Sequence, residues 1–134
     1  MFEKHFDVDA SHIDFQGIVD GLFYPFYLEW TRHAFMRDVV GIDIEQAVKD
    51  GYLYVLSEYS LKFKKPLKMG DKLTVTCELV PNEKSSRFNF KQTIMVDGKV
   101  HAEAEFVATC ILPSGRPGVP DGVKALLTPA VTSF

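Results

Sequence analysis

The chain has 134 residues, a net charge of −3 at pH 7, 46% hydrophobic residues and 25% charged residues. This length is most simply one domain, and the slightly acidic charge excludes the basic surface of a nucleic-acid-binding protein. No stretch of about 18 apolar residues is present, and the N-terminal segment is too charged for a signal peptide, so we expect a cytoplasmic protein without a membrane span. Eleven phenylalanines suggest a well-filled core or an apolar pocket.

The first third of the sequence predicts a strand and then one main helix. Residues 2–11 alternate roughly between apolar and polar side chains, which is typical of a strand. After a loop over residues 12–20, apolar residues recur every three or four positions up to about residue 40, which predicts an amphipathic helix. Pro25 lies in the first turn of this pattern, where its missing N–H is tolerated only near the helix start. The helix therefore begins late or follows a short separate turn.

Residues 41–51 carry the signals of one helix end and one short helix. Gly41 can end the main helix in the left-handed conformation that glycine adopts without strain. Asp43 is placed to cap a helix over residues 44–49, and Gly51 to close it.

The second half of the chain changes to the two-residue period of strands. Turn residues separate the strands, and Asp97-Gly98 is a strong hairpin signal. The predicted strands cover residues 52–65, 72–80 and 100–112, with another marked by Phe88, Phe90, Thr93 and Met95. From residue 113 the sequence is a loop-like tail with one helical turn near residues 123–127.

These elements predict an α+β fold with a single domain over residues 1–134. The main helix carries apolar residues on more than half of its circumference, so it needs cover on several sides. A curved antiparallel sheet built from the strands could wrap it. No repeat, low-complexity segment or second domain is visible in the sequence.

Asp14 is a single acid in a short loop just ahead of the main helix. A carboxylate at this place could act as nucleophile or base on a carbonyl carbon, while free N–H groups at the helix start stabilise the oxyanion. The structural alternative is an Asx turn or a helix cap, a common role for Asp near a glycine such as Gly17. The local sequence leaves both roles open.

The stretch from Asp14 to Arg32 resembles a known family. The pattern of hotdog-fold acyl-CoA thioesterases of the 4-hydroxybenzoyl-CoA thioesterase type is matched by Asp14, Gly17-Ile18-Val19, Tyr24, Glu29 and Arg32. A second match in register with the first comprises Val55-Leu56-Ser57-Glu58, Lys62-Phe63, Lys65-Pro66-Leu67, Gly70-Asp71 and Leu73. The resemblance implies a hotdog fold, in which a five-stranded antiparallel sheet wraps a long central helix. It also implies hydrolysis of an acyl-CoA to a free acid and CoA.

The resemblance implies roles for individual residues as well. Asp14 is expected to be the catalytic base or nucleophile, and the backbone N–H of Gly21 the oxyanion donor. The expected substrate-binding residues are Gly17, Tyr24, Tyr27, Glu58 and Tyr59, and the expected supporting residues are His12, Glu29 and Arg32. The chain departs from the family pattern at His12, where many relatives carry an acid, and at Gly21, where they often carry a histidine.

Several of these residues also have a structural interpretation. Tyr24 and Tyr27 recur at helical spacing, as core residues do. Gly21 can be a plain glycine at the helix start, and Gly17 a turn glycine that positions the preceding acid. Glu58 can be a solvated residue of an exposed strand face.

The expected supporting residues have two interpretations each. Glu29 and Arg32 are three residues apart on a helix, which makes them a weak surface pair or a pair at a subunit contact or beside the site. His12 lies two residues from Asp14, on the same side of an extended segment. It is therefore a supporting residue or an alternative base.

No metal or redox cofactor is expected. Cys77 and Cys110 lie in predicted strands as half-buried thiols, and the four histidines are scattered. Coenzyme A enters only as part of the substrate. The resemblance implies a homo-oligomer built from dimers, with tetramers in many members. A basic cluster could meet the CoA phosphates or be an ordinary charged surface: Lys62, Lys64, Lys65, Lys68 and Arg87.

Two other functions compete with thioester hydrolysis. A hotdog dehydratase would need a histidine paired with an acid, and His12 lacks the His-Phe-Pro context usual in those enzymes. A non-hydrolytic acyl-CoA-binding module would have no use for a carboxylate such as Asp14 near a thioester. Aromatic side chains close to Asp14, among them Tyr24 and Tyr27, limit the volume along the helix and favour short-chain or aromatic acyl groups.

Overall fold

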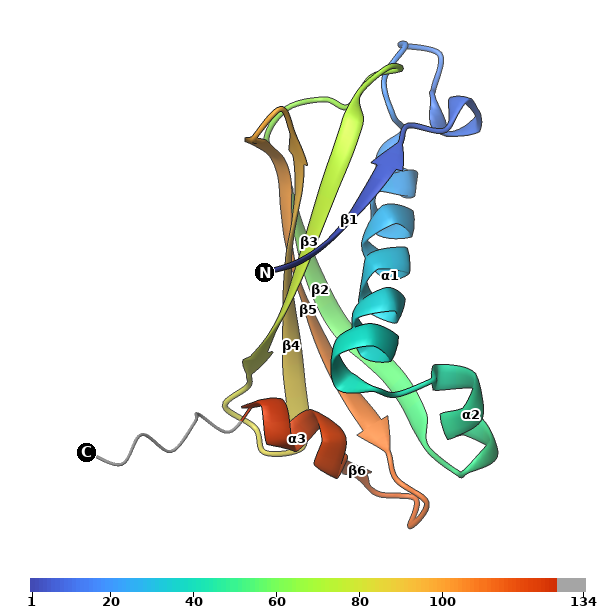
Figure 1. The fold of residues 1–134 in the computed structure, drawn as a ribbon, viewed down its shortest axis with the longest axis vertical. Helices are drawn as coiled ribbons and strands as arrows, with labels where there is room; N and C mark the ends of the chain where they lie inside the picture. Colours follow the sequence, from blue (N-terminus) through green and yellow to red (C-terminus); the bar gives the residue numbers. More distant parts are fainter. Residues whose placement is uncertain (128–134) are drawn as a thin grey trace, which may run out of the picture.

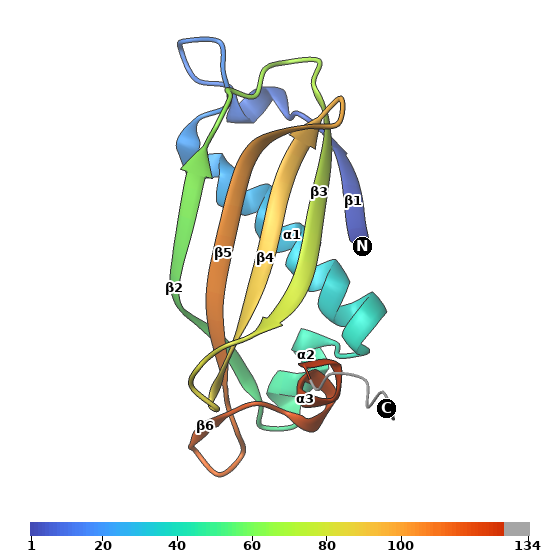
Figure 2. The ribbon, with the colours of Figure 1, turned by 90° about the vertical axis from the view of Figure 1, so that its left-hand side faces the viewer.

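A computed structural model describes residues 1–127, and the end of the predicted tail, residues 128–134, lies outside the described residues. A curled antiparallel sheet packs against one long helix, which lies diagonally across its inner face (Figure 1, Figure 2). The predicted α+β hotdog architecture is therefore confirmed. The strand order is β1–β3–β4–β5–β2, and the two-residue β6, which the sequence did not predict, pairs with β5. The helices are α1 (Tyr24–Phe35), α2 (Ile44–Lys49) and α3 (Asp121–Leu127), and the strands are β1 (Phe2–Asp7), β2 (Leu53–Phe63), β3 (Lys72–Pro81), β4 (Arg87–Val96), β5 (Lys99–Ile111) and β6 (Pro117–Gly118).

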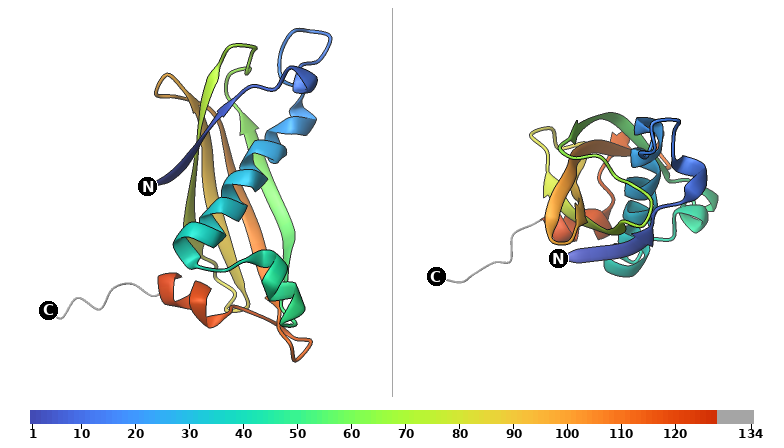
Figure 3. Two further views of the ribbon diagram at one scale, coloured as in Figure 1. Left: turned by 45° about the vertical axis from the view of Figure 1, so that its right-hand side comes forward. Right: turned by 90° about the horizontal axis from the view of Figure 1, so that it is seen from above.

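The core lies between α1 and the inner face of the sheet, which curls around the helix when seen from above (Figure 3). Leu28 of α1 is completely buried, and a fully buried side chain of this size contributes about 1.5–3 kcal/mol. The sheet residues that face α1 alternate along each strand, as the two-residue period requires. They include Leu73, Val75 and Cys77 of β3, Phe88, Phe90 and Ile94 of β4, and Ala102, Ala104, Phe106 and Ala108 of β5.

Proline and glycine mark the start and the end of the main helical segment. A 3₁₀ turn, Gly21–Phe23, precedes α1, and Pro25 lies at its first positions, as the sequence predicted. After Phe35 the chain makes one π-helical turn, Met36–Val40, and Gly41 ends it with φ of 80°. Within residues 1–127, no helix is long and apolar enough to cross a membrane.

The predicted end of the first strand was wrong. β1 ends at Asp7 instead of continuing to residue 11, because the Asp9 carboxylate accepts hydrogen bonds from the backbone N–H and hydroxyl of Ser11 and starts a 3₁₀ turn. In β4, the alternation places Gln92 among the buried residues, 2% exposed, and Thr93 on the outer face. Gln92 is accommodated inside because its side-chain amide is satisfied by three hydrogen bonds.

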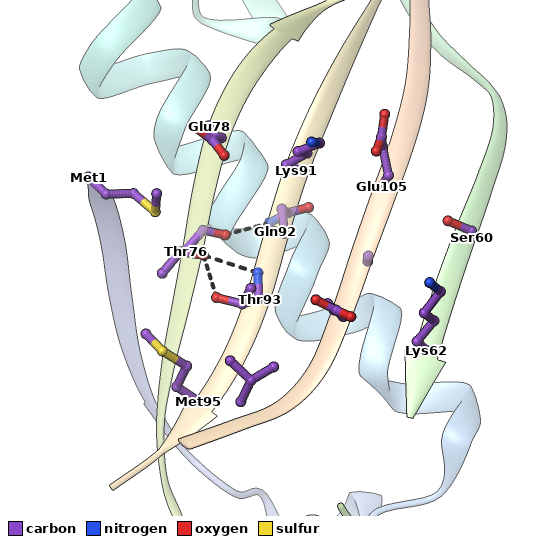
Figure 4. A pocket seen from close by; sticks show the side chains of 13 residues that line it. Met1, Ser60, Lys62, Thr76, Glu78, Lys91, Gln92, Thr93, Met95 and Glu105 are labelled. Carbon is purple, nitrogen blue, oxygen red and sulfur yellow. Dashed lines mark hydrogen bonds between the residues drawn. The ribbon is translucent and has the colours of Figure 1, made fainter. Parts of the chain in front are cut away.

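The outer face of the sheet is polar (Figure 4). Glu78 of β3 stands opposite Lys91 of β4, which in turn stands opposite Glu105 of β5. The hydroxyls of Thr76 and Thr93 are 2.6 Å apart. Opposite charges on facing strands stabilise the pairing. The groove on this face is lined by these polar residues and by a few apolar ones, among them Met1, Met95 and Val100.

Strand β2 forms one edge of the sheet and pairs only with β5. Its inner-face side chains are largely exposed, including Leu56 at 45%, Tyr59 at 52% and Phe63 at 56%. The opposite edge strand, β1, is shorter, and half of its six residues are charged: Glu3, Lys4 and Asp7. Charged residues protect a sheet edge from pairing, whereas a long apolar edge is open to it.

Candidate active site

Asp14 lies in a tight turn between two short bridged segments. Its backbone N–H donates to the carbonyl of Ile18 at 2.8 Å, and the N–H of Gly17 donates to the Asp14 carbonyl at 3.0 Å. Gly17 has φ of 85°, so a glycine is required at this turn. The Asp14 Oδ1 accepts the N–H of Gln16 at 2.8 Å, which is the Asx turn considered from the sequence. This bond uses one carboxylate oxygen, and the other makes no hydrogen bond within the described part of the chain.

The Asp14 loop is fixed to the connection between β2 and β3. The N–H of Val19 donates to the carbonyl of Leu67 at 2.8 Å. The hydroxyl of Tyr24 accepts the N–H of Leu67 at 3.3 Å, and burial raises the pKa of this tyrosine. Tyr24 is in the first turn of α1, and Val19 belongs to the Asp14 loop. Leu67 therefore holds both the helix start and the loop through its backbone N–H and carbonyl.

Gly21 provides a free backbone donor at the start of the helix. The carboxylate of Asp20 accepts the N–H of Leu22 at 2.9 Å, and the Asp20 carbonyl accepts the N–H of Phe23. The N–H of Gly21 makes no hydrogen bond to any of residues 1–127. An unused N–H at a helix start is available for an anion or a polarised carbonyl.

Asp14 and Gly21 line the same cavity, of about 350 Å³, and Asp20 does not line it. Tyr24 and Phe63 form its apolar wall, with ring centroids 4.8 Å apart and the rings edge to face. The cavity therefore brings a carboxylate, a free N–H and apolar surface together. Its other lining residues are Gln16, Ile18, Val19, Lys64, Lys65 and Pro66.

Gln16 and Phe63 were not among the predicted site residues. Gln16 carries no sequence signal beyond its place next to the acid. Phe63 could have been found, because the two-residue period of β2 places it on the same face as Leu61, just before the turn that holds the Asp14 loop. Of the predicted basic cluster, Lys64 and Lys65 reach the cavity, and Lys64 also pairs with Glu103 at 3.1 Å.

His12 is held among aromatic rings and is not one of the cavity residues. Its ring stacks on Phe23 at a centroid distance of 4.3 Å, and its Nδ1 is 2.7 Å from the hydroxyl of Tyr27. The same hydroxyl accepts the N–H of Asp9 at 3.2 Å. His12 therefore supports the helix start, while the structure places Tyr27, 2% exposed, in the core and outside the Asp14 cavity.

We expect Tyr27→Phe to destabilise the fold by about 1–3 kcal/mol, because the bonds to His12 and Asp9 are lost in a buried place. Since the ring itself is kept, kcat should change little. Urea unfolding and steady-state kinetics would measure both quantities. Tyr52→Phe is the matched control, because the described residues give the Tyr52 hydroxyl no hydrogen bond. A large loss of kcat without a loss of stability would place Tyr27 at the substrate instead.

The remaining predicted site residues lie away from Asp14 within one protomer. Glu29 is exposed and Arg32 is buried, and they form no ion pair. Tyr59 is on the inner face of β2, stacked on Phe106 at 4.8 Å. Glu58 pairs with a residue of the outer face, so the alternation of the strand points it away from α1.

The described residues contain no group of three or more histidine, cysteine or acidic side chains that could hold a metal ion. Cys77 and Cys110 are free thiols and are completely buried instead of half-buried. Burial raises the pKa of Cys77 to about 12 and also raises that of Cys110. Both thiols therefore stay protonated and unreactive.

The fold agrees with that of known relatives of the chain. Residues 8–127 match the Thioesterase-like superfamily, and the chain belongs to this family. The 1,4-dihydroxy-2-naphthoyl-CoA thioesterase of Synechocystis has the same fold, with a TM-score of 0.84 at 18% identity over 96% of both chains.

Two curated relatives carry different activities. A 3-hydroxyacyl-(acyl-carrier-protein) dehydratase from Granulibacter bethesdensis is 30% identical over 112 residues, which are 84% of this chain and 61% of the relative. A chloroplastic acyl-acyl carrier protein thioesterase from Arabidopsis thaliana is 31% identical over 77 residues, which are 58% of this chain and 40% of the relative. The chain thus spans less than two thirds of the length of either relative.

Proposed function

We propose that the protein is an acyl-CoA thioesterase that hydrolyses a short-chain or aromatic acyl-CoA to the free acid and CoA. The observation that carries this proposal is the single cavity shared by the Asp14 carboxylate and the unused N–H of Gly21. Thioester hydrolysis needs these two groups: a base or nucleophile, and a donor for the oxyanion. The family supports the same reaction.

Two routes are open to Asp14. As a base, it takes a proton from water while the water oxygen attacks the thioester carbon, and the Gly21 N–H stabilises the oxyanion. The oxyanion then collapses, the C–S bond breaks, and the CoA thiolate takes up the proton. As a nucleophile, the Asp14 carboxylate attacks the thioester carbon and the CoA thiolate leaves. Water then hydrolyses the anhydride formed between the acyl group and Asp14. Both routes give one acid and one CoA per water consumed.

The dehydratase alternative is favoured by the similarity to the Granulibacter relative. Dehydration of a 3-hydroxyacyl thioester needs a histidine beside an acid, and none of the residues lining the Asp14 cavity is a histidine. A panel of acyl-CoAs with a thiol reagent separates the alternatives. We expect release of thiol; formation of an enoyl thioester without thiol release would indicate a dehydratase, and tight binding without turnover a binding module.

We expect the enzyme to prefer small acyl groups. Tyr24 and Phe63 already occupy one wall of the cavity beside Asp14, so little room is left for a long chain. The preference for butyryl- or benzoyl-CoA over palmitoyl-CoA should be graded, since each methylene is worth ~1–3 kcal/mol. Values of kcat/KM across the panel measure it. A tenfold preference for palmitoyl-CoA, about 1.4 kcal/mol, would contradict the expectation.

We also propose a homodimer joined through β2, located in the cytoplasm, where free thiols such as Cys77 persist. The free edge of β2 presents backbone groups, with Leu56, Tyr59 and Phe63 exposed beside them. A two-fold axis perpendicular to the sheet would pair the two β2 strands antiparallel and cover these side chains. If dimers associate further into tetramers, they do so through surfaces other than the β2 edge.

Light scattering at micromolar concentration should therefore give about twice the protomer mass. Tyr59→Lys should shift the protein toward monomer, because it places like charges at the joined edges. Glu3→Lys on β1, the opposite edge strand, should leave the mass unchanged. A wild-type mass equal to one protomer would refute the dimer.

A further inference from the structure

A second cavity, of about 120 Å³, lies on the inner face between the second half of α1, α2 and the Leu53 end of β2. Most of its wall is apolar, formed by Met36, Ile44, Leu56, Phe88, Phe90 and Ala108. An apolar cavity on the order of 150 Å³ can hold a benzene molecule. This cavity therefore suits a short aliphatic chain or a single ring.

Two exposed residues, the acid Glu29 and the histidine His33, also line this cavity, and Arg32 lines it as a buried cation. Arg32 is only 6% exposed, and its guanidinium carbon lies 3.8 Å from the ring centroid of Phe106. One of its five N–H donors reaches the side chain of Gln92 at 3.1 Å. No carboxylate of residues 1–127 lies within 4 Å of it.

A buried guanidinium without an anion is an unusual arrangement. Desolvation lowers the pKa of Arg32 to about 10, although the nearby Glu29 acts in the opposite direction. Leaving a charge unpaired inside a protein is costly, and an anion that enters beside it offsets this cost. A carboxylate matches the guanidinium best, because the two planar groups can form two parallel hydrogen bonds.

The proposed β2 dimer would connect this cavity to the Asp14 site of the other protomer. In one protomer, Phe63 lines the Asp14 cavity, and Tyr54 and Leu56, near the other end of β2, line the Arg32 cavity. Antiparallel pairing over the length of β2 places the Phe63 end of one strand beside the Leu53 end of the other. The Asp14 cavity of one copy then opens toward the Arg32 cavity of its partner.

We propose that the Arg32 cavity holds the far end of the acyl group that is attacked by the partner's Asp14, and that Arg32 selects acyl groups ending in a carboxylate. This inference rests on the proposed thioesterase activity and on the β2 dimer. Arg32 is then a specificity-determining residue that acts across the subunit boundary. The substrate class is the CoA monothioester of a short dicarboxylic acid.

The first experiment compares adipyl-CoA with hexanoyl-CoA, which differ only in the terminal carboxylate and methyl group. We expect kcat/KM of the wild type to favour adipyl-CoA at least about tenfold, as one well-made charged contact would provide. Arg32→Met should bring the ratio of the two values close to one, and Arg32→Lys should retain part of the preference. Equal wild-type values for the two substrates would overturn the proposal, whether or not the variants fold.

The second experiment tests the crossing of the subunit boundary. Co-expression of Asp14→Asn and Arg32→Met chains with different tags yields purified mixed dimers. In these, every active Asp14 belongs to the chain that carries Arg32→Met. If Arg32 acts from the partner, the mixed dimer has the wild-type preference for adipyl-CoA. If the mixed dimer shows the flat ratio of the Arg32→Met protein, Arg32 acts within its own chain and the proposal is wrong.

These outcomes are distinct from failure of the proposed function. A protein that hydrolyses neither substrate nor any other acyl-CoA of the panel would refute the thioesterase. A protein that hydrolyses hexanoyl-CoA at least as well as adipyl-CoA would remain a thioesterase and would refute only the role of Arg32.

Discussion

Replacing Asp14 by Asn is expected to lower kcat by ~10²–10⁴-fold, the usual effect of losing one catalytic acid or base. Asn keeps the shape of the side chain and can still accept the N–H of Gln16, so the turn should survive. The amide is neither a base nor an effective nucleophile. Affinity for acyl-CoA should therefore stay nearly unchanged while turnover is lost.

The matched control is Asp20→Asn, six residues further along the same loop. Asp20 caps the 3₁₀ turn through the N–H of Leu22, and Asn caps a helix as well as Asp does. Both variants remove one negative charge near the helix start, but only Asp14 lines the cavity. Thiol release at saturating substrate measures kcat, and circular dichroism verifies the fold. If Asp14→Asn keeps more than about a third of kcat, Asp14 is not the key residue.

Local signals in the sequence predicted much of the fold. Asp97 and Gly98 both have positive φ, 51° and 75°, as the hairpin signal required. Asp43 caps α2 through the N–H groups of Glu45 and Gln46. These features depend on a few adjacent residues, so they can be recognised without knowing what packs against them.

Features that depend on partners distant in the sequence could not be predicted. Gln92 is a polar residue at an inner-face position of β4, between the buried Phe90 and Ile94. The reason for Gln92 is tertiary: it accepts from Arg32 and donates to the carbonyls of Leu28 and Thr76. No local pattern indicates these contacts.

The candidate site shows the same division. The family resemblance singled out Asp14 and Gly21 in the sequence, and the structure shows that both residues line one cavity. Arg32 appeared in the sequence as a weak helical pair with Glu29. Its burial against Phe106 and its place in a second cavity follow from how α1 crosses the sheet.

The second large effect is expected for Gly21→Pro, which removes the proposed oxyanion donor. Proline has no backbone N–H, and it is favoured at the first position of a helix. Gly21 holds that position in the 3₁₀ turn, and Asp20 before it has ψ of 137°, the extended conformation that a residue before proline adopts. The fold should therefore tolerate the change. We expect kcat to fall by ~10²–10³-fold, the usual loss for one oxyanion-hole donor.

Gly21→Ala separates the donor from the space around it. A Cβ at Gly21 would meet the Phe63 ring at 3.6 Å, an ordinary contact, so Ala fits in the fold and keeps the N–H. Any loss caused by added bulk at the substrate carbonyl should occur in both variants, and the further loss in Gly21→Pro isolates the hydrogen bond. Both proteins should show the wild-type unfolding midpoint in urea. Equal kcat values for the two variants would mean that the Gly21 N–H does not stabilise the oxyanion, and that another donor near Asp14 performs this role.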